Sequence, residues 1–237
     1  AFVLGNKEVP GYRSTYARLI EPTPQDGKEE MFLAGQNRYT ADQQNFTKIP
    51  GAPVVYWVSD RMRGSYDIGK LLKEIAKPRK GLDTADNERF VREWIEVSIQ
   101  KMCIGAKHST SVADTCMKWF PLNSGGLFRK WYGNFERVIN WENNGAALKT
   151  FERAYIRAEA FYFRESITWT KISSSKFGVR YTPQGFIFDS AGQSLFPDQS
   201  RKFYILALLS SVITFEVLKA LNPTLNFQVG DLERIPV

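Results

Sequence analysis

The sequence contains few of the residues that build disulfides, metal sites or histidine-dependent catalysis. Its 237 residues include two cysteines and one histidine. Two cysteines are too few for a disulfide framework in a chain of this length, and they fit a reducing cytosol. Cys103, His108 and Cys116 supply three soft ligands, but structural zinc needs four and usually takes paired Cys-x2-Cys ligands. We therefore favour free thiols and a surface histidine, and we predict no metal site.

The common motifs of catalysis and nucleotide binding are missing as well. The chain has no Walker A loop, no Gly-rich dinucleotide fingerprint and no nucleophile elbow. Asp83 and Asp86 lie where they can cap a helix, which argues against a nuclease-type carboxylate cluster. We predict that this chain has no catalytic residue and binds no cofactor by itself.

Long apolar segments are scarce. The one long run, Phe203–Ala220, is interrupted by Glu216 and Lys219, which predicts a buried helix and not a membrane span. The chain has no charged-then-apolar signal at its start. Because it begins with Ala1 and stops at Val237 without a tail, we expect a fragment of a longer protein.

Hydrophobic and basic residues are plentiful. Hydrophobic residues make up 43% of the chain and aromatic residues 14%, which is enough for a packed core. Lys and Arg number 32 against 25 Asp and Glu, which gives a net charge of +7. A polyanion is therefore a reasonable partner, but the charge alone favours nucleic acid only weakly, because surface cations also serve solvation.

The hydrophobic pattern predicts an α+β fold with a mixed sheet, packed helices and no internal repeat. Residues 1–45 contain two β-like segments, Phe2–Leu4 and Ser14–Ile20. We expect them to be the edge of a preceding domain or a linker from it. We place the boundary near residue 46, so that residues 46–237 form one domain.

Within residues 46–237, capping residues, turn residues and alternating apolar residues define the expected elements. Trp119–Tyr132 has the composition of a loop, and Asn143-Asn144-Gly145 predicts a turn. The expected helices are a short one capped by Ser59 or Asp60, Ala146–Tyr162, and Phe203–Leu221 ended by Asn222-Pro223. Cap or turn residues Asp83, Thr84 and Asp86 precede Arg89–Val97, and the expected strands are Ile167–Ile172, Phe177–Tyr181, Phe186–Phe188 and Leu225–Val229.

Three predicted loops combine cations with hydroxyl, amide or aromatic groups, which are the groups that contact DNA phosphates and bases. The first, Lys77–Gly81, puts cations beside a glycine, and the neutral donors Thr84 and Asn87 follow it. The second, Lys118–Tyr132, has three cations, no acid and five aromatic rings. The third is Lys171–Arg180, with small hydroxyl residues between its cations.

Each loop also has a purely structural explanation. For the first and third loops, a solvated turn explains the residues about as well as DNA contact does. In the second loop, most of the aromatic residues can be explained as core residues. In the second loop we expect Phe120 and Phe128 to be buried, and Arg129 and Lys130 to be exposed. The candidate DNA contacts are Arg79, Lys80, Gly81, Thr84, Asn87, Arg89, Arg129, Lys130, Lys171, Ser174, Lys176 and Arg180.

Segments of unusual composition follow one another along nearly the whole chain. They are Asn37-Arg38-Tyr39, Ile49-Pro50-Gly51, Tyr56–Asp60, Gly81–Phe90, Trp119–Tyr132, Trp141-Glu142-Asn143, Ile167-Thr168-Trp169, Phe186–Asp189 and Leu221–Asp231. In this order they resemble the BREX phage-defence adenine-specific DNA methyltransferases, the PglX family. Because several of the segments are long, the resemblance is specific.

The resemblance implies a position downstream of the catalytic domain, in a target-recognition region that is similar to the specificity domains of type I and type IIG restriction systems. The Gly-x-x-Thr-x-x-Asn-x-x-Phe pattern from Gly81 to Phe90 and the closing segment Asp231–Pro236 are similar to marks of those domains. Ala85 stands where a glycine is expected. It is strained if that position needs a positive φ.

The resemblance also implies what the full enzyme does. We expect it to methylate adenine N6 with S-adenosylmethionine after flipping the base, in the bacterial cytoplasm and without a membrane. This chain lacks the Asn-Pro-Pro-Tyr-type loop that holds a flipped adenine, because Asn222-Pro223-Thr224-Leu225 has no aromatic residue. It would instead recognise double-stranded DNA. Expected partners besides DNA are the methyltransferase domain of the same chain, other BREX proteins and DNA-mimicking phage inhibitors.

Two other functions stay open on the sequence. In the first, the chain docks other defence proteins, and its basic loops lie at the rim of a protein interface. In the second, it is the specificity domain of a restriction-modification enzyme that also cleaves, which requires a nuclease domain elsewhere in the protein.

Overall fold

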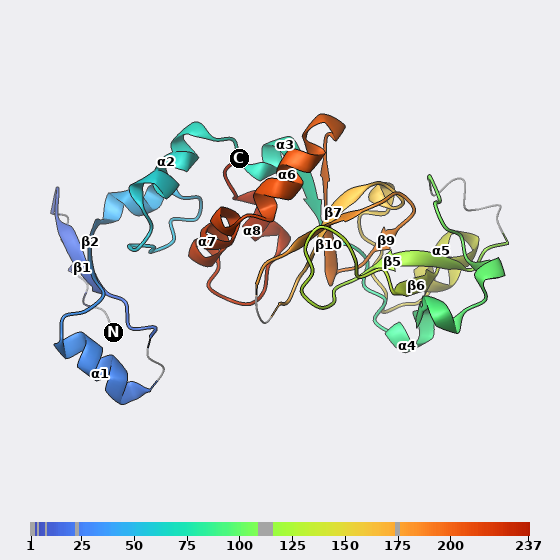
Figure 1. Ribbon diagram of the computed structural model, residues 1–237, viewed down its shortest axis with the longest axis horizontal. Coiled ribbons are helices and arrows are strands. Elements are labelled where there is room, and N and C mark those ends of the chain that lie inside the picture. Colours follow the sequence, from blue (N-terminus) through green and yellow to red (C-terminus); the bar gives the residue numbers. More distant parts are fainter. Residues whose placement is uncertain (1–2, 4, 8, 22–23, 109–115, 174–175) are drawn as a thin grey trace. The chain divides into compact units, whose positions relative to one another are not determined.

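The computed structural model of the chain describes residues 3, 5–7, 9–21, 24–108, 116–173 and 176–237 (Figure 1). It divides into two compact units, Ala1–Gly69 and Lys70–Val237. Helices and strands are mixed in both units, which confirms the predicted α+β class. Phe2 and Leu4, at the ends of the first predicted β-like segment, lie outside the described residues.

The first unit is built on two antiparallel strands, β1 (Arg13–Ala17) and β2 (Arg38–Asp42). Aromatic packing joins later residues to them, because Tyr16 stacks on Tyr56 with ring centroids 4.5 Å apart and contacts the buried Phe46. The division therefore falls after Gly69 and not near residue 46. The other elements of the first unit are α1 (Gln25–Leu33), the 3-10 helix η1 (Gln43–Lys48) and α2 (Asp60–Ile68). Ser59 caps α2, as predicted. That residues 1–45 belong with a preceding domain stays a prediction.

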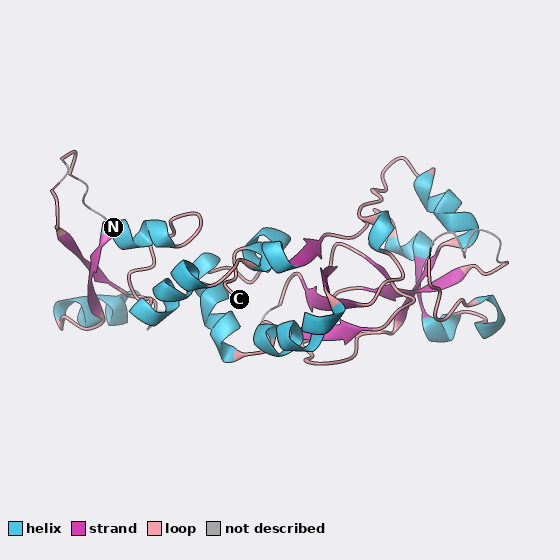
Figure 2. Ribbon diagram, turned by 90° about the horizontal axis from the view of Figure 1, so that it is seen from above, coloured by secondary structure: helices cyan, strands magenta, loops and turns pink. Residues whose placement is uncertain are grey.

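The second unit contains two four-stranded sheets (Figure 2). The first is antiparallel throughout, in the order β3 (Ala76–Arg79), β10 (Gly192–Pro197), β7 (Ser166–Thr170) and β8 (Val179–Thr182). The second has the order β4 (Val91–Glu93), β6 (Arg137–Asn140), β5 (Trp119–Asn123) and β9 (Ile187–Phe188), with β9 parallel to β5. Strands β7, β8 and β9 confirm the predictions made from alternating residues.

Helices of the second unit pack on both sheets. Helices α3 (Leu72–Ile75), α6 (Lys202–Leu209), α7 (Val212–Leu221) and α8 (Val229–Glu233) lie beside the first sheet (Figure 1). Helices α4 (Asn87–Phe90) and α5 (Glu142–Lys149) lie with the second sheet. The 3-10 helices are η2 (Trp94–Glu96), η3 (Ile99–Lys101), η5 (Glu159–Phe161) and η6 (Gln199–Arg201).

The helix expected over Phe203–Leu221 is two helices, bent by 74° at a short break. The break forms because the Ser211 hydroxyl accepts the Thr214 N–H and starts α7, while the Thr214 hydroxyl donates to the Leu208 carbonyl. The predicted end before Asn222-Pro223 is confirmed. Among the described residues no single helix is long and apolar enough to cross a membrane, and only the bent pair Gln199–Leu209 and Val212–Leu221 reaches that length and composition.

Three other expectations are corrected. Trp119–Asn123 is the buried strand β5 and not a loop, because it pairs with β6 and β9. The helix expected over Ala146–Tyr162 ends at Lys149. Leu225–Val229 is not a strand, since only Asn226 makes an isolated bridge, to Ile172.

The turn predicted around Gly145 is confirmed. Asn143, Asn144 and Gly145 have φ of 50°, 56° and 75° and form a left-handed turn inside α5. A side chain at Gly145 would lie 2.7 Å from the ring of buried Trp141. The turn therefore needs glycine both for its φ and for the packing.

The two sheets meet through backbone contacts at the ends of three strands. The Leu82 N–H donates to the Phe188 carbonyl at 3.2 Å, and the Ser190 N–H donates back to the Leu82 carbonyl at 2.9 Å. Within the second sheet, the Asp189 N–H donates to the Asn123 carbonyl at 3.1 Å and extends the pairing of β9 with β5. A Cβ on Gly81 would lie 2.1 Å from the Phe188 carbonyl oxygen. Glycine at this position therefore lets the two backbones approach.

We predict that Gly81→Ala destabilises the second unit by about 3 kcal/mol or more, because the added methyl group meets backbone that cannot rotate away. Gly230→Ala is the matched control, since a Cβ there has no atom within 4 Å. Urea unfolding of both variants measures the difference. Equal stability of the two variants would mean that this contact does not restrict the packing of the sheets.

Glu165 ties the first sheet to the start of α6. Its carboxylate accepts hydrogen bonds from Lys202 at 2.7 Å, Gln199 at 3.0 Å and the Tyr181 hydroxyl at 2.9 Å. The hydrogen bond from Lys202, followed by those from Gln199 and Tyr181, lowers the pKa of Glu165 to about 2 from an ordinary 4.5. The charged carboxylate therefore stabilises the folded state above pH 4.5, and this stabilisation is lost as pH falls toward 2.

Glu165→Gln should accordingly unfold at lower urea than the wild type at neutral pH, with a difference that shrinks as pH falls from 4.5 toward 2. Glu216→Gln, which removes an exposed pair with Lys219, serves as the control and should change stability by less than about 1 kcal/mol. A loss of stability in Glu165→Gln that stays constant over this pH range would contradict the lowered pKa of Glu165.

Candidate nucleic-acid interface

The first and third predicted loops leave the first sheet at the same end, whereas the second follows β5 of the second sheet. The register places Arg79 of β3 opposite Ser194, Ser194 opposite Thr168, and Thr168 opposite Arg180. Because neighbouring strands are antiparallel, β3 and β7 end where β8 and β10 begin. The residues after β3, after β7 and before β8 therefore lie in one region, although the first and last are about a hundred residues apart in the sequence.

The first loop is largely occupied by local contacts. Arg79 donates to the Pro78 carbonyl and lies 5.1 Å from the centroid of the Phe161 ring. Lys80 lies 3.6 Å from the Asp83 carboxylate. Gly81 is buried, and its lack of a side chain allows the contact with Phe188. The prediction that a phosphate approaches this glycine therefore does not fit the structure.

Asp83 is the centre of an ion-pair network at this loop. Arg157 and Ser190 both donate to its carboxylate, and Lys80 lies nearby. Burial raises its pKa, but the hydrogen bonds from Ser190 and Arg157 outweigh burial, and the pKa is lowered overall. Asp83 therefore stays charged and offsets part of the positive charge of Lys80.

The turn from Thr84 to Arg89 is closed by its own hydrogen bonds. The buried Thr84 hydroxyl donates to Asn87, and Asp86 caps α4 by accepting the Arg89 N–H at 3.1 Å. Ala85 has a φ of +55°, which is the positive φ expected at the position where glycine is usual. Of the predicted contacts in this turn, Asn87 and Arg89 are exposed.

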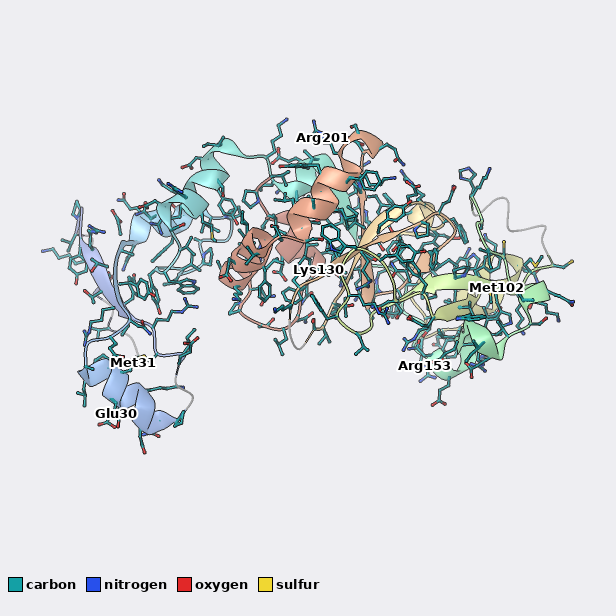
Figure 3. All side chains as sticks on the ribbon, viewed as in Figure 1. Glu30, Met31, Met102, Lys130, Arg153 and Arg201 are labelled. Atoms are coloured by element: carbon teal, nitrogen blue, oxygen red, sulfur yellow. The ribbon has the colours of Figure 1, made fainter. Side chains whose placement is uncertain are left out.

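The second loop lies along β8. Trp131 donates its N–H to the Val179 carbonyl and accepts the Tyr181 N–H, both at 2.9 Å. Arg129 and Lys130 are exposed, as predicted. The Lys130 ammonium also donates to the Ser210 carbonyl at 2.6 Å, at the end of α6 (Figure 3).

Aromatic residues of this loop are divided between core and surface. Phe120 is fully buried, as predicted, because it lies in β5. Phe128 is 42% exposed, so the prediction that it is core is wrong: it lies against Gly178 at the surface. Trp131 and Tyr132 are more than half exposed. The loop therefore presents rings and cations together, a combination typical of surfaces that contact nucleic acid.

The third loop contributes one exposed cation and one buried cation. Lys176 is exposed, and Lys171 is half-buried. We predicted that Arg180 contacts DNA, but in this structure Arg180 has no exposed surface and is not accessible to DNA. Its guanidinium donates to the Thr170 hydroxyl at 3.3 Å. Ser174 lies outside the described residues.

Arg180 is a buried charge without an ion pair among the described residues. Two of its nitrogens, Nε and Nη2, have no hydrogen-bond partner. Burial lowers its pKa to about 10, with a further lowering by Arg129 and an opposing contribution from Glu136. The guanidinium is therefore charged at neutral pH.

A surface pocket of about 360 Å³ opens among these loops. Its walls combine small residues, hydroxyl groups and two cations. They are Ser124, Gly125, Gly126, Arg137, Thr170, Lys171, Ile172, Ser190 and Ala191. Sequence reasoning found Lys171 but missed Arg137, because Arg137 lies just beyond the second loop, at the start of β6, and has no basic neighbours.

Metal-ligating residues are not gathered here. Within the described ranges, no three His, Cys, Asp or Glu side chains are placed to hold one ion. Cys103 and Cys116 are free thiols.

The comparisons connect the chain to adenine-specific methyltransferases. No family model matches it. Over its whole length it is 38% identical to the adenine-specific methyltransferase PglX of Lacticaseibacillus casei (strain Zhang). It is 36% identical, also over its whole length, to the adenine-specific methyltransferase BrxX of Escherichia coli O9:H4 (strain HS).

The whole chain therefore corresponds to one region of adenine-specific methyltransferases. The particular family is that of PglX and BrxX, the methyltransferases of BREX defence systems. The matched region makes up 21% and 19% of the two proteins, so the chain spans about a fifth of the length of the curated relatives that it matches.

S-adenosylmethionine, the usual cofactor of this class, does not fit the pocket. The sulfonium, ammonium and carboxylate of the cofactor add up to a net positive charge, whereas the pocket is lined by the cations Arg137 and Lys171 and by no carboxylate. No aromatic side chain lines the pocket to stack on adenine. No step of methyl transfer is therefore assigned to these residues.

We predict that Ala85→Gly stabilises the fold by about 0.5–1 kcal/mol, because glycine adopts a positive φ without the Cβ repulsion that alanine has. Ala147→Gly is the contrasting variant: Ala147 is an exposed residue of α5, and glycine there should cost about 0.5–1 kcal/mol. Urea unfolding compares the two. Destabilisation of similar size in both variants would contradict strain at Ala85.

Proposed function

We propose that this chain recognises a duplex DNA sequence for a SAM-dependent adenine-N6 methyltransferase of a bacterial, cytoplasmic BREX-type defence system. The observation that supports this most directly is that the first and third basic loops leave one end of the first sheet, where the second loop lies along the start of β8. The chain's match to a segment of adenine-specific methyltransferases supplies the context, since such an enzyme must select its target adenine.

In the proposal, the exposed groups of the loops and of α4 contact different parts of the DNA. Arg89, Arg129 and Lys176 neutralise phosphates and provide affinity that depends on salt. Asn87 and the rings of Trp131 and Tyr132 are available for base edges and sugars, where specificity arises. Arg180 contacts DNA only if the second loop moves.

The rest of the enzyme completes the proposal. The cofactor and the flipped adenine bind in a methyltransferase domain outside this chain, and recognition loops position that domain over the target. Other BREX proteins and DNA-mimicking inhibitors remain proposed partners. A mimic would use the same cations as DNA does.

A second candidate function has one observation in its favour. Helices α6 and α7 expose Phe203, Tyr204, Val212 and Ile213, each by more than half. Exposed apolar side chains of this size are typical of protein contacts. On this alternative the chain docks another protein, and the basic loops bind DNA weakly or not at all.

The test uses the full-length protein and the duplex that it selects from a random pool. We predict that Arg129→Ala lowers affinity for this duplex about fivefold to tenfold and makes the dependence of log K on log salt shallower by about one. Trp131→Ala should reduce the preference for the selected over a scrambled duplex. Lys130→Ala is less informative, because Lys130 also contacts Ser210.

Arg201→Ala is the matched control, since Arg201 is an exposed cation of η6 that lies outside the predicted contacts (Figure 3). It should leave affinity within about twofold, as expected of a cation that contacts no phosphate. Arg129 and Trp131 variants that bind and discriminate like the wild type would exclude this loop from the DNA interface and favour the docking function.

A further inference from the structure

The pocket beside the loops combines positive charge with hydrogen-bond donors. Arg137 and Lys171 line it, and within the described residues neither makes an ion pair. The Ser124 hydroxyl also lines it, and Arg137 donates to that hydroxyl at 3.3 Å. In the described parts of the chain, the backbone N–H groups of Gly125 and Gly126 donate to no protein acceptor. Cations and free donors on one concave surface are the elements of an anion site.

A buried cation lies directly behind this pocket. Arg180 donates to the hydroxyl of Thr170, and Thr170 is part of the pocket wall. Because Arg180 is fully buried with two unpartnered nitrogens, its charge is poorly compensated. An uncompensated buried charge is costly, and an anion in the adjacent pocket would offset part of that cost.

The nearby acids offset this positive charge only in part, because Glu136 favours the charged form of Arg180 but is exposed and makes no ion pair among the described residues. Asp189 lies behind Ser124, and its carboxylate accepts the Ser124 hydroxyl and the N–H groups of Ala191 and Gly192. It is turned toward these donors and is not part of the pocket wall. Asp83 is paired with Arg157. The pocket wall itself contains no acid.

Small residues leave the pocket open to a bulky anion. At Gly125 a side chain would lie 3.2 Å from Ala191 and would narrow the pocket. The volume of about 360 Å³ exceeds what an isolated phosphate needs and leaves room for the sugars that flank it in a nucleic-acid strand. The pocket also lies at the end of the sheet where the exposed cations of the loops are gathered.

We propose that this pocket is a docking site for one phosphodiester group of the DNA backbone, bound by Arg137, Lys171 and the amides of Gly125 and Gly126. The proposal rests on the proposed function, and it adds a fixed phosphate contact that sets the register of the loops on the duplex. Phosphate contacts of this kind position a protein, while neighbouring side chains contact base edges.

The test measures binding of the full-length protein to the duplex selected by the wild type, across a potassium chloride series. Arg137→Gln and Lys171→Gln should each weaken binding about tenfold and reduce the salt slope by about one. Lys73→Gln, at an exposed position of α3 outside the pocket, is the matched control and should change neither. Thermal unfolding verifies that all variants are folded.

A second measurement locates the phosphate. Duplexes with one neutral methylphosphonate linkage, scanned along each strand, should show a position that weakens wild-type binding but has no further effect on the Arg137→Gln protein. The phosphate site would be overturned if both pocket variants had the affinity and salt slope of the wild type. It would also be overturned if the effects of the neutral linkage and of Arg137→Gln on binding were additive at every linkage. Either result would leave the proposed function intact. Failure of the wild type to prefer any duplex would overturn the proposed function, and the phosphate site with it.

Discussion

The close backbone contact between Gly81 and Phe188 is the constraint on which the rest of the second unit depends. It lets the end of β3 lie against the end of β9, and the hydrogen bonds of Leu82 and Ser190 extend that contact. Because β9 is paired with β5 in the other sheet, the contact fixes the two sheets together. The loops after β3, β5 and β7 are then brought to one place, and the candidate interface exists only because of this arrangement.

Two ionisable side chains at this junction, Asp189 and Arg180, differ in their hydrogen-bond partners. Burial raises the pKa of Asp189, but its carboxylate has a hydroxyl and two backbone N–H groups as donors. Arg180 has one hydroxyl partner and two nitrogens without any. An anionic ligand in the open pocket would stabilise the positive charge of such a buried cation. The stabilisation is larger than for a cation that already has an ion-pair partner, because the ligand supplies the missing negative charge.

Sequence reasoning predicted local features better than features that distant residues create. The alternation of apolar and polar residues predicted β7 and β8. The sequence also predicted a position that favours glycine at Ala85, which has a positive φ. Strand β5 was taken for a loop, because Pro121 and Asn123 are unusual in strands and one of its two partners, β9, lies far along the chain. Similarly, Arg180 is buried by segments remote in sequence, which no local pattern indicates. Several of the predicted DNA contacts thus share one region, but Asn87 and Arg89 lie in α4 beside the second sheet. Gly81, Thr84 and Arg180 are buried, and Arg137 was missed.

The central claim is that the loops at this end of the first sheet determine which DNA sequence is selected. The most direct measurement replaces residues 124–134 in the full-length protein with the corresponding loop of the Lacticaseibacillus casei relative, and determines the sequence selected from a random duplex pool. The account predicts that the swapped protein stays folded and selects a sequence that differs at some positions from the one chosen by the wild type. Selection of the unchanged sequence at every position by a folded, DNA-binding variant would contradict it.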